Sequence, residues 1–222
     1  LPNVSFEDTL RSCLTHKPYG KQPGHAEFYY PKEYGYGELW LRMADAIRNQ
    51  IEYNKAVKSI DFNTHEVRAT DGSSYTADVI ITTIPWPEIK HSISKLKYSS
   101  IQTEYFEENL DTPCHWIYYP DPKLPYHRIL VRHNFCANSK GYWTETNSER
   151  ICMEEPNNNF KYLNQYAYPL NTVEKPQIMK ELLAWSKAHN VIGLGRWGEH
   201  QHYNSDVTVE LAMKLADELT EQ

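Results

Sequence analysis

A glycine-rich string near the C-terminus could bind phosphate. Residues 193–198, GLGRWG, match the G-x-G-x-x-G pattern and follow an expected strand. Amides of such loops bind phosphate, and Arg196 adds a guanidinium. In a dinucleotide-binding βαβ unit the helix opens within the glycines, whereas here the next helical pattern begins at Val207. We therefore expect either a plain glycine turn or a loop and helix that close over a cofactor bound mainly elsewhere.

Two arginines lie in the alternating segment 127–133. Period-two alternation predicts that Arg128, Leu130 and Arg132 share one face of a strand, with the two cations close together. A guanidinium stays protonated and cannot act as a general base, but it can bind a diphosphate or stabilise a leaving group. The alternative is a solvated or ion-paired strand face.

Histidines and cysteines give weaker signals. His200 and His202 could bind a metal with Glu199 or His115, but no further ligand stands at a recognisable spacing, and we expect no metal. The sequence has no C-x-x-C pair, which favours reduced thiols and a cytoplasmic protein. The cysteines are Cys13, Cys114, Cys136 and Cys152. The absence of a G-x-S-x-G motif leaves hydrolase activity without support.

Composition narrows the class of protein. The 222 residues carry a net charge of -6 and 40% hydrophobic residues, which is ordinary for one large or two small domains. Excess acidic charge argues against nucleic acid or an anionic membrane as partner, and no apolar run is long enough to cross a bilayer. The 17 tyrosines and 6 tryptophans favour a carbohydrate or ring-shaped ligand.

The elements that must position these residues mix helices with strands. Apolar residues recur at helical spacing in the segments 6–13, 39–49, 88–93, 173–189 and 207–219. Strand patterns fall at 51–53, 56–62, 66–70, 77–84, 99–168 and 191–194. Gly35 and Gly37 stand just ahead of the second helix. We expect an α/β fold of the mixed α+β type, in one interwoven piece.

Several segments together resemble the FAD-dependent UDP-galactopyranose mutases and, more distantly, the amine oxidase and protoporphyrinogen oxidase superfamily. Residues 28–40 resemble the mutases' glycine-containing loop and helix beside the flavin, with Tyr34 in place of one glycine. Residues 77–85 are similar to the strand that returns to the FAD domain. Residues 124–129 resemble the mutase segment that carries the catalytic arginine, and residues 166–172 resemble the segment that carries a substrate-binding tyrosine. Residues 195–198 resemble the mutases' Gly-Arg element. The order and spacing of the three segments match as well.

This resemblance implies a set of site residues. It assigns catalysis to Arg128, and it assigns substrate binding to Tyr168 and Tyr126. Substrate binding is also implied for His202, where the mutases have a second tyrosine, and for Tyr118, where they have an asparagine. FAD contacts are implied for Gly35, Tyr36, Gly37, Gly195, Arg196, Trp197, Gly198 and Asn204.

The implied fold is the C-terminal portion of an FAD/NAD(P)-binding flavoprotein with a β-rich substrate-binding sheet. Residues 1–84 would form the flavin-proximal helix, meander and returning strand, 85–168 the substrate-binding portion, and 169–222 the end of the FAD domain. The family's N-terminal βαβ unit, which binds the ADP half of FAD, has no counterpart here. We therefore expect a fragment beginning at Leu1 that forms homo-oligomers or associates through the uncovered surface, with activity of the chain alone left open.

The implied activity is interconversion of the pyranose and furanose forms of a nucleotide sugar, in cell-surface polysaccharide biosynthesis. Reduced FAD would act as a nucleophile towards the sugar, Arg128 would neutralise the leaving diphosphate, and Tyr168 would donate a hydrogen bond to it. Two alternatives stay open. One is a flavin-dependent oxidoreductase of the same superfamily, and the other is a non-catalytic fragment that binds a sugar nucleotide or a partner chain.

Overall fold

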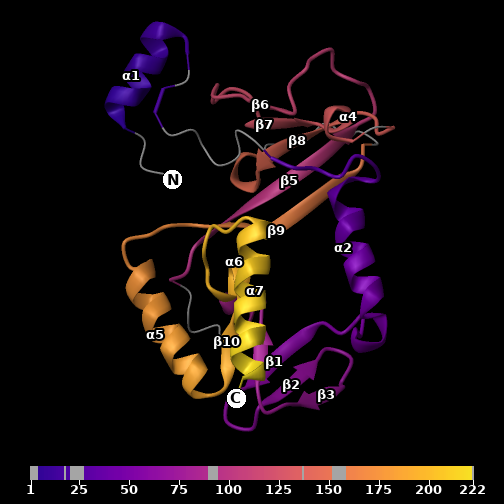
Figure 1. The fold of residues 1–222 in the computed structure, drawn as a ribbon, viewed down its shortest axis with the longest axis vertical. Coiled ribbons are helices and arrows are strands. Elements are labelled where there is room, and N and C mark those ends of the chain that lie inside the picture. Colours follow the sequence, from indigo (N-terminus) through magenta and orange to yellow (C-terminus); the bar gives the residue numbers. More distant parts are fainter. Residues whose placement is uncertain are drawn as a thin grey trace.

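The chain forms a broad sheet and a smaller layer of helices and strands. The helix α2 (Gly35–Ala46) runs along one side between them (Figure 1). The computed structural model describes residues 5–17, 19–20, 28–89, 95–136, 138–151 and 159–221. In Figure 1, strands β5 to β9 form the upper half, and α5, α7, β10 and the β1–β3 meander form the lower half. The mixed helix and sheet fold expected from the sequence is confirmed.

Each expected helical segment contains a helix, but several bounds differ. The helices are α1 Phe6–Thr15, α2 Gly35–Ala46, η1 Arg48–Gln50, α3 Trp86–Ile89, α4 Arg132–Phe135, η2 Ser148–Arg150, α5 Lys175–Ala188, α6 Gly195–Gly198 and α7 Ser205–Thr220. Helix α3 begins two residues before the expected start, and residues 90–93 of the expected 88–93 helix lie outside the described residues. Cys13, Cys114 and Cys136 are free thiols, and Cys152 also lies outside the described residues.

Helix α2 starts earlier than expected. Gly35 and Gly37 lie in its first turn, not ahead of it, and the helix ends at Ala46 before the 3-10 turn η1. The earlier start is supported by Tyr30, whose hydroxyl accepts a hydrogen bond of 3.2 Å from the Tyr36 amide. That bond satisfies one of the amides that a helix start leaves without a partner.

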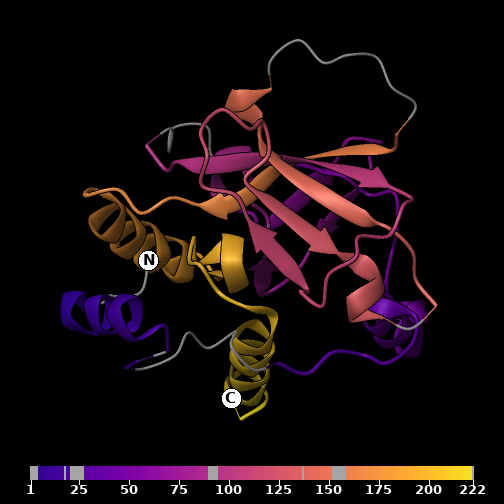
Figure 2. The same ribbon diagram turned by 90° about the horizontal axis from the view of Figure 1, so that it is seen from above.

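The strands form three sheets. They are β1 Val57–Asp61, β2 Glu66–Ala69, β3 Ser74–Thr76, β4 Ile80–Thr82, β5 Tyr98–Phe106, β6 Trp116–Tyr118, β7 Arg128–Val131, β8 Tyr142–Asn147, β9 Lys161–Pro169 and β10 Val191–Gly193. The largest sheet is antiparallel with the order β6-β7-β8-β5-β9, β1-β2-β3 is a meander, and β10 pairs with β4 in parallel. Figure 2 shows the strands of the largest sheet side by side, with α4 at one end, close to α2.

Two strand expectations are wrong. Residues 51–53 form no strand, whereas 74–76 form β3, which was not expected. The apolar run 77–84 contributes only the three residues of β4, and Ile81 is 47% exposed although Ile80 and Thr82 are buried. Successive side chains of this apolar run therefore point to a covered and to an uncovered face of β4 in turn, because other elements pack against β4 on one side only.

The main core lies between α5 and the β4–β10 pair. Its buried members are Ile60, Ile80, Trp86, Leu96, Met179, Leu182 and Val191. Trp86 and Val191 are fully buried. The indole Nε1 of Trp86 donates a 2.7 Å hydrogen bond to the carbonyl of Gly198, the last residue of α6. The core thereby holds the loop between β10 and α7 in place.

The first and last glycines of the GLGRWG string are required by packing. A Cβ at Gly198 would overlap the Thr82 carbonyl oxygen and lie 2.8 Å from the Gly193 carbonyl carbon. Both neighbours are main-chain atoms and cannot turn aside. Gly193 and Gly198 therefore allow α6 to lie directly against the ends of β4 and β10.

We expect Gly198→Ala to lower the free energy of unfolding by about 2 kcal/mol or more, because the methyl group overpacks a backbone contact. Gly37→Ala is the matched control, since a Cβ at Gly37 meets nothing within 4 Å. In the helix α2 that change should be neutral or stabilising by about 0.5–1 kcal/mol. Urea denaturation of both variants measures the difference, and equal stability of the two would contradict this account of the glycine pair.

Candidate functional site

Arg128 stands at the centre of a polar cluster on the largest sheet. It is paired in register with Tyr118 on β6 and with Glu145 on β8. Its Nε donates to Glu145 Oε2 at 2.8 Å, Nη1 donates to the Tyr118 hydroxyl at 3.2 Å, and Nη2 donates to the Tyr168 hydroxyl at 3.2 Å. Three neighbouring strands and the end of β9 thus bring these side chains together.

The ion pair keeps Arg128 charged. Glu145 is buried, and its Oε2 lies 2.6 Å from Nη2 of Arg128. Burial alone would lower the pKa of the Arg128 guanidinium, but the Glu145 carboxylate together with Tyr168 and Tyr118 more than offsets this, and the pKa is raised. Because the Tyr118 and Tyr168 hydroxyls accept from Arg128, their own O–H hydrogens are free to donate. The cluster can therefore offer two hydroxyl donors and a guanidinium to an anion.

A second cation lies behind Tyr168. The Tyr168 and His202 rings are stacked, with centroids 4.9 Å apart and planes 5° apart, and the Arg196 guanidinium lies 5.4 Å from the Tyr168 ring centroid. Arg196 donates to the Tyr203 carbonyl from Nε and Nη2, at 3.1 and 2.7 Å, and to the Ala167 carbonyl from Nη1, at 3.2 Å. Burial and then Arg196 lower the pKa of His202, so its imidazole is neutral near pH 7.

A cavity of about 340 Å³ lies between α2 and α7. It is lined by Trp40, Arg196, Tyr203, Ser205, Thr208, Val209 and Ala212. The Tyr36 hydroxyl and Ser205 Oγ, 2.6 Å apart, join the two helices. Mostly apolar walls with one guanidinium suit a flat ring that carries a polar or anionic edge.

Two backbone features border this cavity. Gly195 has a φ of +74°, and a Cβ there would lie 3.0 Å from the Thr208 methyl carbon. Asn204 precedes the first turn of α7 without capping it through its side chain. Helix α7 begins at Ser205, two residues before the expected helical range 207–219. The amides of this first turn are not used by the Asn204 side chain.

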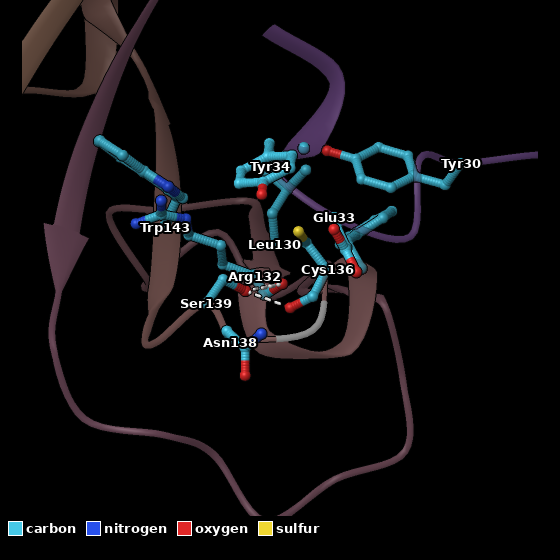
Figure 3. A pocket seen from close by; sticks show the side chains of 11 residues that line it. Tyr30, Glu33, Tyr34, Leu130, Arg132, Cys136, Asn138, Ser139 and Trp143 are labelled. Atoms are coloured by element: carbon cyan, nitrogen blue, oxygen red, sulfur yellow. Dashed lines mark hydrogen bonds between the residues drawn. The ribbon is translucent and has the colours of Figure 1, made fainter. Parts of the chain in front are cut away.

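A second cavity, of about 640 Å³, lies between the start of α2 and the β7–β8 region (Figure 3). Its wall includes Tyr34, Leu130, Arg132 and Trp143. The expectation that Arg132 continues the strand is wrong, because β7 ends at Val131 and Arg132 begins α4. The Arg132 guanidinium instead lies 5.7 Å from the Tyr105 ring centroid. The two cations, Arg128 and Arg132, therefore belong to different surroundings.

Three other residues expected to bind substrate or FAD lie outside the Arg128 cluster and the cavity between α2 and α7. Tyr126 packs edge-on against Tyr119, with ring centroids 5.2 Å apart. Trp197 packs against Tyr166 and His200, at 5.4 and 5.7 Å between ring centroids, and does not line the cavity between α2 and α7. Gly37 faces open space.

Among the residues that the structure describes, no cluster of three or more histidine, cysteine or acidic side chains is placed to hold a metal ion. No helix among them has the length and apolar character needed to cross a membrane.

Glu145 was not singled out from the sequence. Only the register between β7 and β8 places it opposite Arg128, and those strands are joined by a segment that contains α4. The alternating run 142–147 predicts a strand but not its partner.

Comparison with known proteins agrees with this architecture. A solved structure of reduced UDP-galactopyranose mutase matches with a TM-score of 0.72 and 14% identity, over 89% of this chain and 53% of that chain. A "putative protoporphyrinogen oxidase" from Exiguobacterium sp. 255-15 gives a TM-score of 0.49 and 11% identity, over 70% and 46%. A search of curated proteins finds no match.

The chain therefore has the fold of part of the solved UDP-galactopyranose mutase, and it spans about half the length of that protein. The sequence model of the UDP-galactopyranose mutase family matches residues 26–202, which is most of the chain. The chain belongs to the UDP-galactopyranose mutase family, as its motifs predicted.

Proposed function

We propose that this chain forms the diphosphate-binding and flavin-closing part of an enzyme that interconverts pyranose and furanose forms of a nucleotide sugar. The observation that carries the proposal is the Arg128 cluster, in which a charged guanidinium and two tyrosine hydroxyls converge. Family membership supports the choice of a UDP-sugar as substrate. In this proposal residues 1–84 and 169–222 contribute to the FAD domain, and 85–168 to the substrate sheet.

Each member of the cluster has a distinct role in this proposal. Arg128 neutralises charge that builds on the diphosphate as it leaves the sugar, while Glu145 fixes the direction of the guanidinium. Tyr168 and Tyr118 donate hydrogen bonds to phosphate oxygens. His202, neutral and stacked on Tyr168, can donate a further hydrogen bond where the family has tyrosine.

The residues between α2 and α7 fit FAD. The apolar cavity accepts a flat ring, and Gly195, with its positive φ, lets the chain pass close to Thr208 in the wall of this cavity. Arg196 and the first turn of α7 provide positive charge for a pyrophosphate or for the polar edge of the ring. When bound and reduced, FAD supplies the nucleophile for the sugar carbon. In this proposal Gly35, Tyr36, Gly195 and Arg196 hold it.

A second candidate is a sugar-nucleotide-binding module without catalysis. It is favoured by one observation, that the Arg128 cluster is formed by residues outside the lining of the cavity between α2 and α7. The module would use the same Arg128 cluster but would not need the cavity between α2 and α7.

Three measurements on the purified chain test the proposal. We expect UDP to bind in a calorimetric titration while uridine, which lacks the diphosphate, binds far more weakly. We also expect flavin absorption bands to stay with the protein through desalting after FAD is added, and UDP-galactose to be isomerised under reducing conditions. Binding of UDP without FAD would favour the binding module, and failure to bind either ligand would contradict both candidates.

A further inference from the structure

A buried lysine stands at the start of α5. Lys175 is 4% exposed, and its Nζ donates to Asn171 Oδ1 at 2.7 Å and to Gln201 Oε1 at 3.4 Å. Both partners are neutral amides. Among the residues that the structure describes, no carboxylate forms an ion pair with Lys175. Within the described part of the chain, the ammonium is therefore buried without a compensating charge.

This arrangement is unfavourable for the fold in two ways. A buried cation without a counter-charge loses hydration that amide oxygens only partly replace, and burial accordingly lowers the pKa of Lys175. Lys175 is also the first residue of α5, where the helix dipole is positive and repels a cation. A neutral side chain could bond to the same two amides at lower cost. Charges retained at such cost are candidates for function.

Lys175 joins the two segments that carry the stacked rings of the proposed diphosphate site. Asn171 follows Tyr168 by three residues, and Gln201 immediately precedes His202. By bonding to both amides, the ammonium links the end of β9 to the turn between α6 and α7. The field of Lys175 also reaches His202, whose pKa is lowered by burial, by Arg196 and, to a smaller extent, by Lys175.

The Lys97 carbonyl makes a second link between the same segments. It accepts from the Leu170 amide at 2.9 Å and lies 3.1 Å from Nε2 of His200. His200 is fully buried, and its Nδ1 has no hydrogen-bond partner among the described residues. Since this neutral link already ties the segments, the positive charge of Lys175 is not needed to join them.

We propose that Lys175 is a positioning residue of the diphosphate site, whose uncompensated charge is held behind Tyr168 and His202 to favour an anionic ligand there. The inference rests on the proposed function and deepens it. Two nitrogen atoms of Arg128 contact Glu145, and three of Arg196 donate to main-chain carbonyls. Lys175 has no acidic partner in the described part of the chain, so its field remains available to the phosphates.

The test compares Lys175→Gln with Lys180→Gln in the full chain. Gln keeps a hydrogen-bond donor but removes the charge, and Lys180, exposed on the same helix, gives the same change in net charge. We expect Lys175→Gln to weaken UDP binding about tenfold, with a shallower dependence on salt and with uridine binding unchanged. We expect its melting temperature without ligand to equal or exceed that of the wild type. Lys180→Gln should leave UDP affinity, its salt dependence, uridine binding and the melting temperature unchanged.

Three outcomes would overturn the inference. Equal losses of UDP and uridine binding in Lys175→Gln would show a structural role only, and so would a lower melting temperature with unchanged UDP affinity. Lys175→Met, which removes both hydrogen bonds as well, separates these cases, because it should weaken UDP binding at least as much. If the wild type binds neither UDP nor inorganic pyrophosphate, the proposed function itself fails. If the wild type, Lys175→Gln and Lys180→Gln bind UDP equally, the inference alone fails.

Discussion

Arg128→Ala is expected to weaken UDP binding about 100-fold or more. The variant loses the guanidinium that faces the ligand. It also leaves the Glu145 carboxylate, 9% exposed, without its guanidinium partner and with His127 Nε2 3.7 Å away, next to an incoming anion. Removing one member of a hydrogen-bonded buried pair costs about 3–5 kcal/mol, and part of that cost will appear as lower stability. Calorimetric titration with UDP and urea denaturation measure the two effects.

Two control variants separate charge from geometry. Arg128→Lys keeps the positive charge but cannot bond to Glu145, Tyr118 and Tyr168 at once, so we expect intermediate affinity. Adding Glu145→Gln to Arg128→Ala should restore much of the stability without restoring UDP binding, because the unpaired carboxylate is removed but the guanidinium is still missing. UDP affinity of Arg128→Ala within twofold of the wild type would show that the diphosphate does not bind at this cluster.

The largest loss of stability is expected from Trp86→Ala. Trp86 is fully buried in the cluster with Ile60 and Val191, and truncation of such a side chain costs about 3–5 kcal/mol through lost burial and an unfilled cavity. The change also removes the hydrogen bond from the indole Nε1 to the Gly198 carbonyl. Because a domain is stable by about 5–15 kcal/mol, urea denaturation should show a large fall in midpoint.

Trp86→Phe isolates the hydrogen bond within this effect. It keeps most of the apolar area but cannot donate to Gly198, so we expect a loss of about 1–3 kcal/mol, well below that of alanine. Since Gly198 ends α6, next to Arg196 on the same short helix, this variant should also loosen the wall of the cavity between α2 and α7. A Trp86→Phe protein as stable as the wild type would show that the bond to Gly198 contributes no net stability.

Much of the candidate site can be predicted from short segments. Arg128, Tyr168 and Arg196 stand in motifs whose residue order is informative by itself, and the structure brings all three together. The positions of the long helices α5 and α7 also follow from local periodicity, which depends on neighbours three and four residues apart. Their bounds shift by only a few residues, as capping residues compete at helix ends.

Other features depend on contacts between distant segments. Tyr118 and Glu145 meet Arg128 through strand register, and Lys175 is buried between Asn171 and Gln201, which lie 30 residues apart in the numbering. Alternation along a strand states which residues share a face but not which strand lies opposite, and helical periodicity does not reveal that a lysine at a helix start is covered. The sequence alone therefore determined the family, most of the element types and the motif residues. The tertiary structure decided the partners, burial and charge balance around them, because pairing and packing are set by chain segments far apart.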